Sequence, residues 1–158
     1  MSDLEIFALP VGRGLLGLSA MPGLGGDYLA DLRSILRWGP SLVVSLTEAH
    51  EPGDTAARLC DDLRHASPDW AGLPIADYGV PDAAATLRWV GLEQRITARL
   101  AAGRRVLVHC RGGCGRSGMI VLRLMVLHGE APDAALARLR ALRPCAVETP
   151  AQRLWATR

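Results

Sequence analysis

Short apolar runs alternate with longer amphipathic segments along this chain. The runs are rich in leucine and valine and end near glycine or proline, which is typical of strands buried in a sheet. A glycine-containing turn joins the first two runs, so this pair predicts a hairpin. The predicted strands are Glu5–Val11, Leu15–Leu18, Ser41–Leu46, Leu73–Ala76 and Arg105–His109.

The segments between these runs predict helices, because their apolar residues recur at helical spacing. Asp27 is placed to cap a helix that ends at Gly39, and a long helix follows Asp82 and ends at Gly103. Further helices are predicted at residues 54–65, 119–127, 131–142 and 149–155.

Two of these helices carry an apolar stripe that we expect to face the sheet. The stripes are Leu29, Leu32, Ile35 and Leu36 in one helix, and Leu87, Val90, Leu92, Ile96 and Leu100 in the other. Residues 119–127 are apolar almost all round, which predicts a helix through the middle of the molecule. The pattern predicts a single α/β domain over residues 1–158, with a central, mostly parallel sheet and helices on both faces.

The composition excludes several classes of protein. Of the 158 residues, 49% are hydrophobic and 22% are charged, so the chain is neither disordered nor fibrous. All 18 basic residues are arginine and they are scattered, so no nucleic-acid partner is indicated. The absence of lysine suits a GC-rich, bacterial genome. Because no signal peptide and no membrane span is evident, we expect a cytoplasmic monomer that does not bind membranes.

The four cysteines are too few and too unevenly spaced to predict a disulfide framework, which favours a reducing compartment. Cys60 and Cys145 are interpreted as structural or incidental. No group of histidines and cysteines has the spacing of metal ligands, so neither a metal nor another cofactor is expected.

One segment carries the chemistry of this chain. A predicted strand ends at Cys110, a glycine-rich turn follows, and Arg116 begins the next helix. The glycines let the backbone curl so that successive N–H groups point inward and hold an oxyanion. The helix N-terminus adds positive charge at the same point, so the turn is a candidate phosphate cradle.

The same surroundings favour a reactive cysteine at position 110. A helix N-terminus and a neighbouring arginine both stabilise a thiolate, and a thiolate that faces a phosphate is a nucleophile aimed at phosphorus. Arg116 is suited to grip two phosphate oxygens through its planar guanidinium. The hydroxyl of Ser117 is placed to hydrogen-bond the sulfur and to stabilise it as a leaving group.

The pattern His109-Cys110-x5-Arg116-Ser117 resembles the signature of the cysteine-based protein tyrosine phosphatase superfamily. Within it, the chain is most similar to small dual-specificity phosphatases of the kinase-associated phosphatase branch and their bacterial relatives. Residues 74–82 resemble the general-acid loop of that branch, and residues 147–152 resemble its late, glutamine-bearing segment. The resemblance covers roughly residues 40–155 and implies a phosphatase fold.

The resemblance also implies roles for three further residues. Asp77 would be the proton donor, Gln152 would help to place the hydrolytic water, and His109 would order the phosphate loop. Asp82 is an alternative proton donor, although a helix cap after Pro81 also explains it. The predicted catalytic residues are Cys110, Arg116, Asp77, Ser117, His109 and Gln152, and the predicted phosphate loop is Arg111, Gly112, Gly113, Cys114, Gly115 and Arg116.

Two features depart from the resemblance. Cys114 places a second thiol near the nucleophile, where it is either inert or able to form a regulatory disulfide with Cys110. No separate phosphotyrosine-recognition loop is recognisable, which argues against strict phosphotyrosine specificity and favours a shallow pocket.

The predicted activity is a metal-independent hydrolysis of phosphotyrosine, phosphoserine or phosphothreonine through a cysteinyl-phosphate. The partners are then phosphorylated proteins or small phosphate esters, including phosphoinositides. Two other classes stay open: a module that binds phosphorylated partners without turnover, and a rhodanese-type sulfur transferase.

Overall fold

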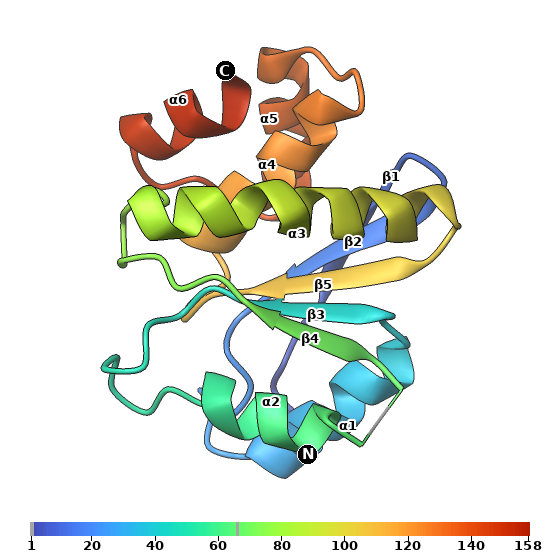
Figure 1. Cartoon of the computed structure of the whole chain (residues 1–158), viewed down its shortest axis with the longest axis vertical. Coiled ribbons are helices and arrows are strands. Elements are labelled where there is room, and N and C mark those ends of the chain that lie inside the picture. Colours follow the sequence, from blue (N-terminus) through green and yellow to red (C-terminus); the bar gives the residue numbers. More distant parts are fainter. Residues whose placement is uncertain (1, 66) are drawn as a thin grey trace.

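A mixed sheet of five strands forms the middle of the molecule, in the order β1-β2-β5-β3-β4 (Figure 1). The computed structural model describes residues 2–65 and 67–158. Only β1 and β2 are antiparallel, and the other neighbouring strands are parallel. The strands are β1 (Phe7–Val11), β2 (Gly14–Ser19), β3 (Leu42–Ser45), β4 (Asp69–Gly72) and β5 (Arg105–His109).

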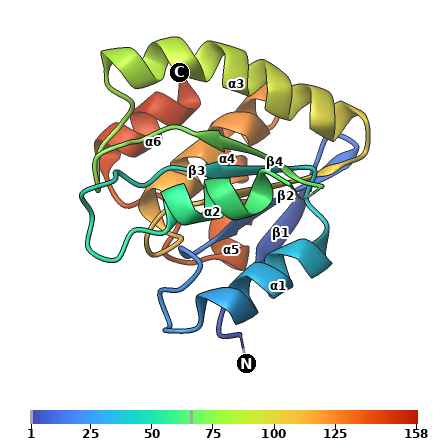
Figure 2. The same ribbon diagram turned by 60° about the horizontal axis from the view of Figure 1, so that its bottom comes forward.

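Six helices within the described residues cover the two faces of this sheet. Helices α1 and α2 lie on one face, and α3 to α6 lie on the other (Figures 1 and 2). This arrangement confirms the predicted α/β fold. The helices are α1 (Tyr28–Trp38), α2 (Ala56–Leu63), α3 (Ala83–Ala101), α4 (Gly115–Leu127), α5 (Pro132–Leu142) and α6 (Pro150–Thr157).

The central strand β5 shows why the sheet is covered on both faces. Successive side chains of a strand point to opposite faces. Val106 and Val108 belong to the larger core cluster, with residues of α3 and α4, whereas Leu107 packs with Ile35 and Leu59 on the side of α1 and α2. Both clusters exclude water, and burial on both faces explains why the sequence of β5 is an apolar run without alternation.

One predicted strand is wrong. The structure places β4 at Asp69–Gly72, four positions before the predicted Leu73–Ala76, where it pairs with β3. The N–H groups of Leu73 and Ile75 still donate to the carbonyls of Ser45 and Leu46, so this segment follows the sheet edge without being a strand. Its leucine and isoleucine reflect burial in the core, and burial alone does not define a strand.

The predicted apolar stripes are only partly correct. Leu29, Leu36, Leu87 and Val90 are exposed, with Leu87 80% accessible. The sheet side of α3 is formed instead by Ala85, Trp89, Leu92, Ile96 and Leu100. Side chains on opposite sides of a helix cannot both contact the sheet. The apolar pattern alone does not determine which side of the helix packs against the sheet. No helix of the described residues is long and apolar enough to cross a membrane.

Candidate active site

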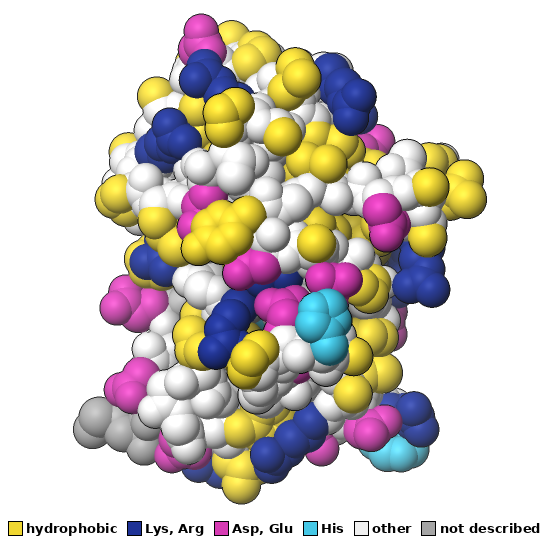
Figure 3. Space-filling model, turned by 90° about the vertical axis from the view of Figure 1, so that its left-hand side faces the viewer, with side chains coloured by type: hydrophobic (Ala, Val, Ile, Leu, Met, Phe, Trp, Pro, Cys, Tyr) yellow, Lys and Arg dark blue, Asp and Glu magenta, His cyan; other side chains and the backbone are white. Residues whose placement is uncertain are grey.

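Four loops meet where the carboxyl ends of the parallel strands reach the surface, which is the face shown in Figure 3. Acidic and basic side chains gather near the centre of this face (Figure 3). Contacts between the loops, given below, bring the predicted site residues together. The loops follow β3 (residues 46–55), β4 (73–82) and β5 (110–114), and the fourth precedes α6 (143–149).

Cys110 is the first residue after β5, and its side chain is buried. Its Sγ lies 3.3 Å from the hydroxyl oxygen of Ser117, so the predicted hydrogen bond is present. Ser117 lies in the first turn of α4, where backbone N–H groups have no carbonyl of their own helix to bond. Sulfur, hydroxyl and helix N-terminus therefore lie together.

Arg116 is buried beside this cysteine, with only 1% of its side chain exposed. Its two terminal nitrogens donate to the carboxylate oxygens of Glu51 at 2.7 and 2.8 Å, and one also donates to the carbonyl of Ile75. The buried Nε has no hydrogen-bond partner among the described residues. The two terminal nitrogens of the guanidinium are thus bonded to the protein, while the Nε–H donor forms no hydrogen bond with the described residues.

The Arg116–Glu51 pair carries charge on both partners. Burial lowers the pKa of Arg116, but the hydrogen bonds with Glu51 and the nearby Cys110 outweigh this effect, and the pKa lies above its ordinary value. Burial likewise raises the pKa of Glu51, and the hydrogen bonds from Arg116 overcome it, so that this pKa lies below its ordinary value. Glu51 is a functional residue that the sequence did not predict, because no spacing links it to Arg116.

The two candidate proton donors differ in position. Asp77 is half-exposed, and its Oδ1 lies 3.3 Å from a terminal nitrogen of Arg116. The same oxygen accepts the N–H of Tyr78, whose positive φ of 60° shapes the turn. Asp82 instead caps α3 and accepts the N–H of Ala85 at 2.8 Å. Only Asp77 is therefore placed against the arginine of the site.

His109 is buried below the phosphate loop. Its Nδ1 lies 3.0 Å from the carbonyl of Cys110, which can only accept, so Nδ1 carries the proton. Its Nε2 then accepts from the hydroxyl of Ser45, which in turn accepts the indole N–H of Trp70. Burial lowers the pKa of His109, in agreement with a neutral ring. The chain of hydrogen bonds holds the backbone at the nucleophile.

Gln152 is buried and bonded to backbone on both sides. Its side-chain oxygen accepts the N–H groups of Glu148 and Thr149, and its amide nitrogen donates to the carbonyl of Gly79. With Thr149 it forms the capping box of α6. The side chain thus ties the start of α6 to the loop that carries Asp77.

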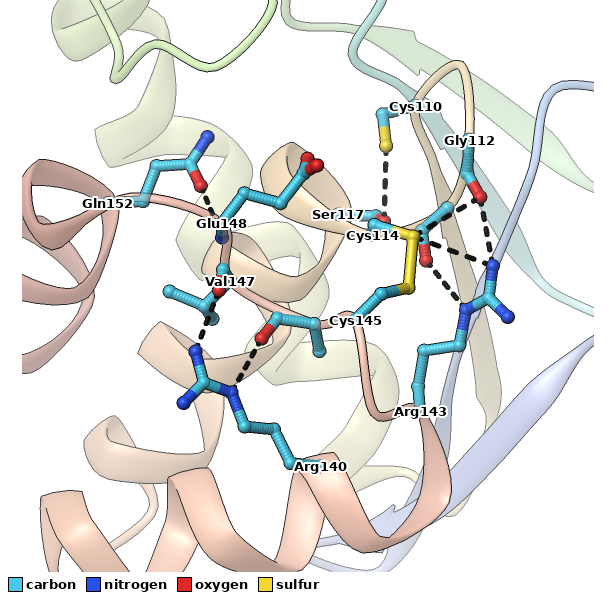
Figure 4. Close-up of a disulfide and its surroundings, with 12 residues drawn as sticks. Cys110, Gly112, Cys114, Ser117, Arg140, Arg143, Cys145, Val147, Glu148 and Gln152 are labelled. Carbon is cyan, nitrogen blue, oxygen red and sulfur yellow. Dashed lines mark hydrogen bonds between the residues drawn. A yellow bond between two sulfur atoms is a disulfide. The ribbon is translucent and has the colours of Figure 1, made fainter.

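The phosphate loop is fastened from outside by a disulfide between Cys114 and Cys145 (Figure 4). The sequence predicted no disulfide framework and considered only Cys110 as a partner of Cys114. The structure corrects this, because Cys114 pairs with Cys145 and Cys110 is free. The two cysteines are 31 positions apart in sequence, and only the tertiary fold brings their Cα atoms to 5.2 Å.

Arg143 adds a second attachment to the same loop. Its guanidinium donates to the carbonyls of Gly112 and Gly113 at 3.0 and 3.1 Å (Figure 4). It also lies over the ring of Phe7, 4.6 Å from the ring centre. Gly113 has a φ of +72°, and a Cβ there would lie 2.6 Å from the backbone of Ser19. The loop passes too close to β2 for any side chain at this position.

Comparison with known proteins gives both sequence and structural relatives. The family described as PTP-SAK, "Swiss Army Knife protein, DSP-PTPase phosphatase domain", matches residues 26–154. Cyclin-dependent kinase inhibitor 3 of Homo sapiens is 36% identical over 72 residues, which are 44% of this chain and 32% of that protein. The chain spans a third or less of the length of the curated relatives that it matches.

Two solved structures share the fold over nearly the whole chain. Kinase associated phosphatase superposes with a TM-score of 0.82 at 24% identity, over 99% of this chain and 93% of the other, and this likeness shows the fold alone. Tk-PTP in its active form superposes with a TM-score of 0.73 at 29% identity, over 94% of this chain and 92% of the other. The chain thus has a fold that is already known from solved structures.

Proposed function

The chain belongs to the PTP-SAK family of DSP-PTPase phosphatase domains, and we propose that it is a cysteine-dependent, metal-independent phosphomonoesterase acting on phosphotyrosine, phosphoserine or phosphothreonine. The observation that carries this proposal is the arrangement of three groups. The buried sulfur of Cys110, the unpartnered Nε of Arg116 and the carboxylate of Asp77 converge at the start of α4.

In the first step, the phosphate of the substrate binds the N–H groups of residues 111–116 and the Nε of Arg116. The thiolate of Cys110 attacks phosphorus, and the bond between phosphorus and the ester oxygen breaks. Asp77 enters this step protonated and gives its proton to the departing oxygen. The products are a free alcohol or phenol and a cysteinyl-phosphate.

In the second step, water attacks the phosphorus of the cysteinyl-phosphate. Asp77, now ionised, accepts a proton from this water, and Cys110 leaves as a thiolate that the hydroxyl of Ser117 stabilises. Inorganic phosphate is released and the enzyme returns to its starting state. General acid–base catalysis of this kind contributes about 10²–10⁴ in rate.

Three other residues act through these groups. Glu51 holds the guanidinium of Arg116 in place through two hydrogen bonds, and His109 holds the carbonyl of Cys110. Gln152 was predicted to place the hydrolytic water. Its contact with Gly79 favours a second role, which is to position the Asp77 loop.

The direct test is turnover of para-nitrophenyl phosphate in the presence of EDTA, combined with alkylation of Cys110 by iodoacetate. We expect hydrolysis to continue in EDTA, and we expect arsenate to protect Cys110 from alkylation. If the protein binds phosphate without turnover, the proposal is wrong and the chain is a phospho-binding module. Sulfur transfer from thiosulfate to cyanide, without phosphate release, would replace it by a rhodanese-type activity.

The cytoplasmic location and the bacterial source remain predictions from the sequence. The redox state of the Cys114–Cys145 pair tests the cytoplasmic location, because a reducing cytoplasm keeps accessible thiols reduced. Alkylation of the protein immediately after cell lysis, followed by mass spectrometry, reads the state of the pair. Alkylated cysteines support a cytoplasmic location, and an intact disulfide contradicts it.

A further inference from the structure

Glu148 holds a carboxylate against the phosphate loop, and nothing in the mechanism above uses it. A Cβ built on Gly115, the first residue of α4, would lie only 2.1 Å from its Oε1. Figure 4 shows its side chain reaching from the segment before α6 towards the start of α4. The carboxylate therefore lies beside the backbone that is proposed to bind the phosphate.

The backbone on both sides of this carboxylate is fixed. The N–H of Val147 donates to the carbonyl of Cys114, and the N–H of Glu148 donates to the side-chain oxygen of Gln152. Val147 is itself buried and has a positive φ of 64°. A side chain that starts from so constrained a backbone is restricted in where it can point, and here it lies over Gly115.

The charge of Glu148 is not neutralised by the protein. Its carboxylate forms no hydrogen bond or ion pair with any other residue in the part of the chain that the structure describes. Glu51 differs, because it is almost fully buried and its charge is matched by Arg116. Glu148 thus presents an exposed negative charge at the edge of the cradle.

A second carboxylate belongs to Glu48, on the loop of Glu51, and its Oε1 lies 3.8 Å from Nε2 of the exposed His50. Two cations lie at the phosphate loop: Arg111 donates to the carbonyl of Pro52, and Arg143 donates to the carbonyls of Gly112 and Gly113. The Glu148 carboxylate nevertheless lies directly on the start of α4, beside the backbone that is proposed to bind the phosphate.

We propose that Glu148 is a specificity-determining residue of this site. It selects phosphopeptides with a basic residue beside the phosphorylated one, and it disfavours substrates that carry a second anionic group near the ester. The inference rests on the proposed phosphatase activity and adds the class of substrate to it. Two unit charges about 4 Å apart that remain hydrated change binding by about fivefold.

The test compares two phosphotyrosine peptides that differ only in whether arginine or glutamate flanks the phosphotyrosine. We expect the wild-type enzyme to have the higher kcat/KM for the arginine peptide. In Glu148→Gln this preference should fall by about fivefold, and in Glu148→Arg it should reverse. Because both peptides carry the same phosphate, the ratio removes any general effect of the substitution on phosphate binding.

Glu5→Gln is the matched control, because Glu5 is an exposed glutamate on the N-terminal segment, outside the four loops of the site. This variant should keep the wild-type ratio. Raising the salt concentration should reduce the preference of the wild type and leave that of Glu148→Gln almost unchanged, because salt screens exposed charges. A merely structural role of Glu148 at the start of α4 would shift the melting temperature without changing the ratio.

Two results would overturn the inference. One is an equal ratio in the wild type and Glu148→Gln, and the other is faster hydrolysis by the wild type of a phosphoinositide with two phosphates than of the arginine peptide. Turnover of para-nitrophenyl phosphate separates this failure from that of the proposed function. If the enzyme hydrolyses this compound but shows no charge preference, the proposed phosphatase activity stands and only the proposed role of Glu148 is refuted.

Discussion

The phosphate loop and the loop of Asp77 face the same site but are built differently. Cys110, Arg116 and Ser117 are buried, and their loop is fastened by a disulfide and by the guanidinium of Arg143. Asp77 is half-exposed and the next residue, Tyr78, is 61% exposed. The difference suits the two tasks: a nucleophile and its cation need fixed geometry, whereas a proton donor must admit substrate and release product.

The second loop is attached to the site through two backbone carbonyls and through Asp77 itself. The carbonyl of Ile75 accepts from Arg116, and the carbonyl of Gly79 accepts from Gln152. Between them, the carboxylate of Asp77 contacts Arg116 at 3.3 Å. Substitutions in the phosphate loop should therefore affect stability and activity together, and substitutions in the Asp77 loop should affect activity alone.

The largest expected effect is that of Cys110→Ser. Without the sulfur nucleophile, turnover should fall by about 10⁴-fold or more. Binding of vanadate should persist, because Arg116 and the backbone N–H groups are unchanged. Steady-state hydrolysis of para-nitrophenyl phosphate and vanadate binding by calorimetry measure the two quantities. Substantial turnover in this variant would contradict the cysteinyl-phosphate mechanism.

The second effect concerns the proton donor. Asp77→Asn should lower kcat for alkyl phosphates by about 10²–10⁴, and for aryl phosphates by less, because a phenolate departs more readily without a proton. Asp82→Asn is the matched control in a helix cap, and it should retain activity on both substrates. Equal losses on the two substrates, or a larger loss in Asp82→Asn, would reassign the acid.

The third effect tests the rigidity of the phosphate loop. Cys145→Ser removes a crosslink between residues 31 positions apart, and loop-closure entropy predicts a loss of about 3–4 kcal/mol in the free energy of unfolding. Denaturant unfolding without reductant measures this loss. Adding dithiothreitol should lower the free energy of unfolding of the wild type towards that of the variant. Cys60→Ser removes a free cysteine and should show no dependence on reductant. A wild type that is unaffected by reductant would mean that the crosslink does not stabilise the loop.

The smallest effect is a pH dependence of stability from His109. Burial lowers its pKa in the folded protein, so below about pH 6.5 the unfolded chain binds more protons than the folded one. The free energy of unfolding should then fall as the pH falls, by at most about 1.4 kcal/mol per pH unit from this group. His109→Gln should flatten this slope between pH 6.5 and 5 in denaturant titrations. An unchanged slope would show that another group dominates.

Local sequence predicted much of this fold because its signals act over short distances. The strand Arg105–His109, the hairpin and the caps at Asp27 and Asp82 are confirmed at the predicted positions. Each depends on burial on both faces or on a side chain that bonds its own helix. The predicted strand at Leu73–Ala76 is wrong because strand pairing depends on a partner that is distant in sequence.

The amino-acid sequence by itself determined the order of strands and helices and the residues of the cysteine–arginine loop, because these depend on neighbours within one turn or one strand. Only the tertiary structure decided that Glu51 holds Arg116, that Cys114 pairs with Cys145 and that Glu148 lies on Gly115. These contacts join segments far apart in the chain, and no spacing in the sequence encodes them. They form because the carboxyl ends of the parallel strands, and the loops that follow them, lie along the same edge of the sheet.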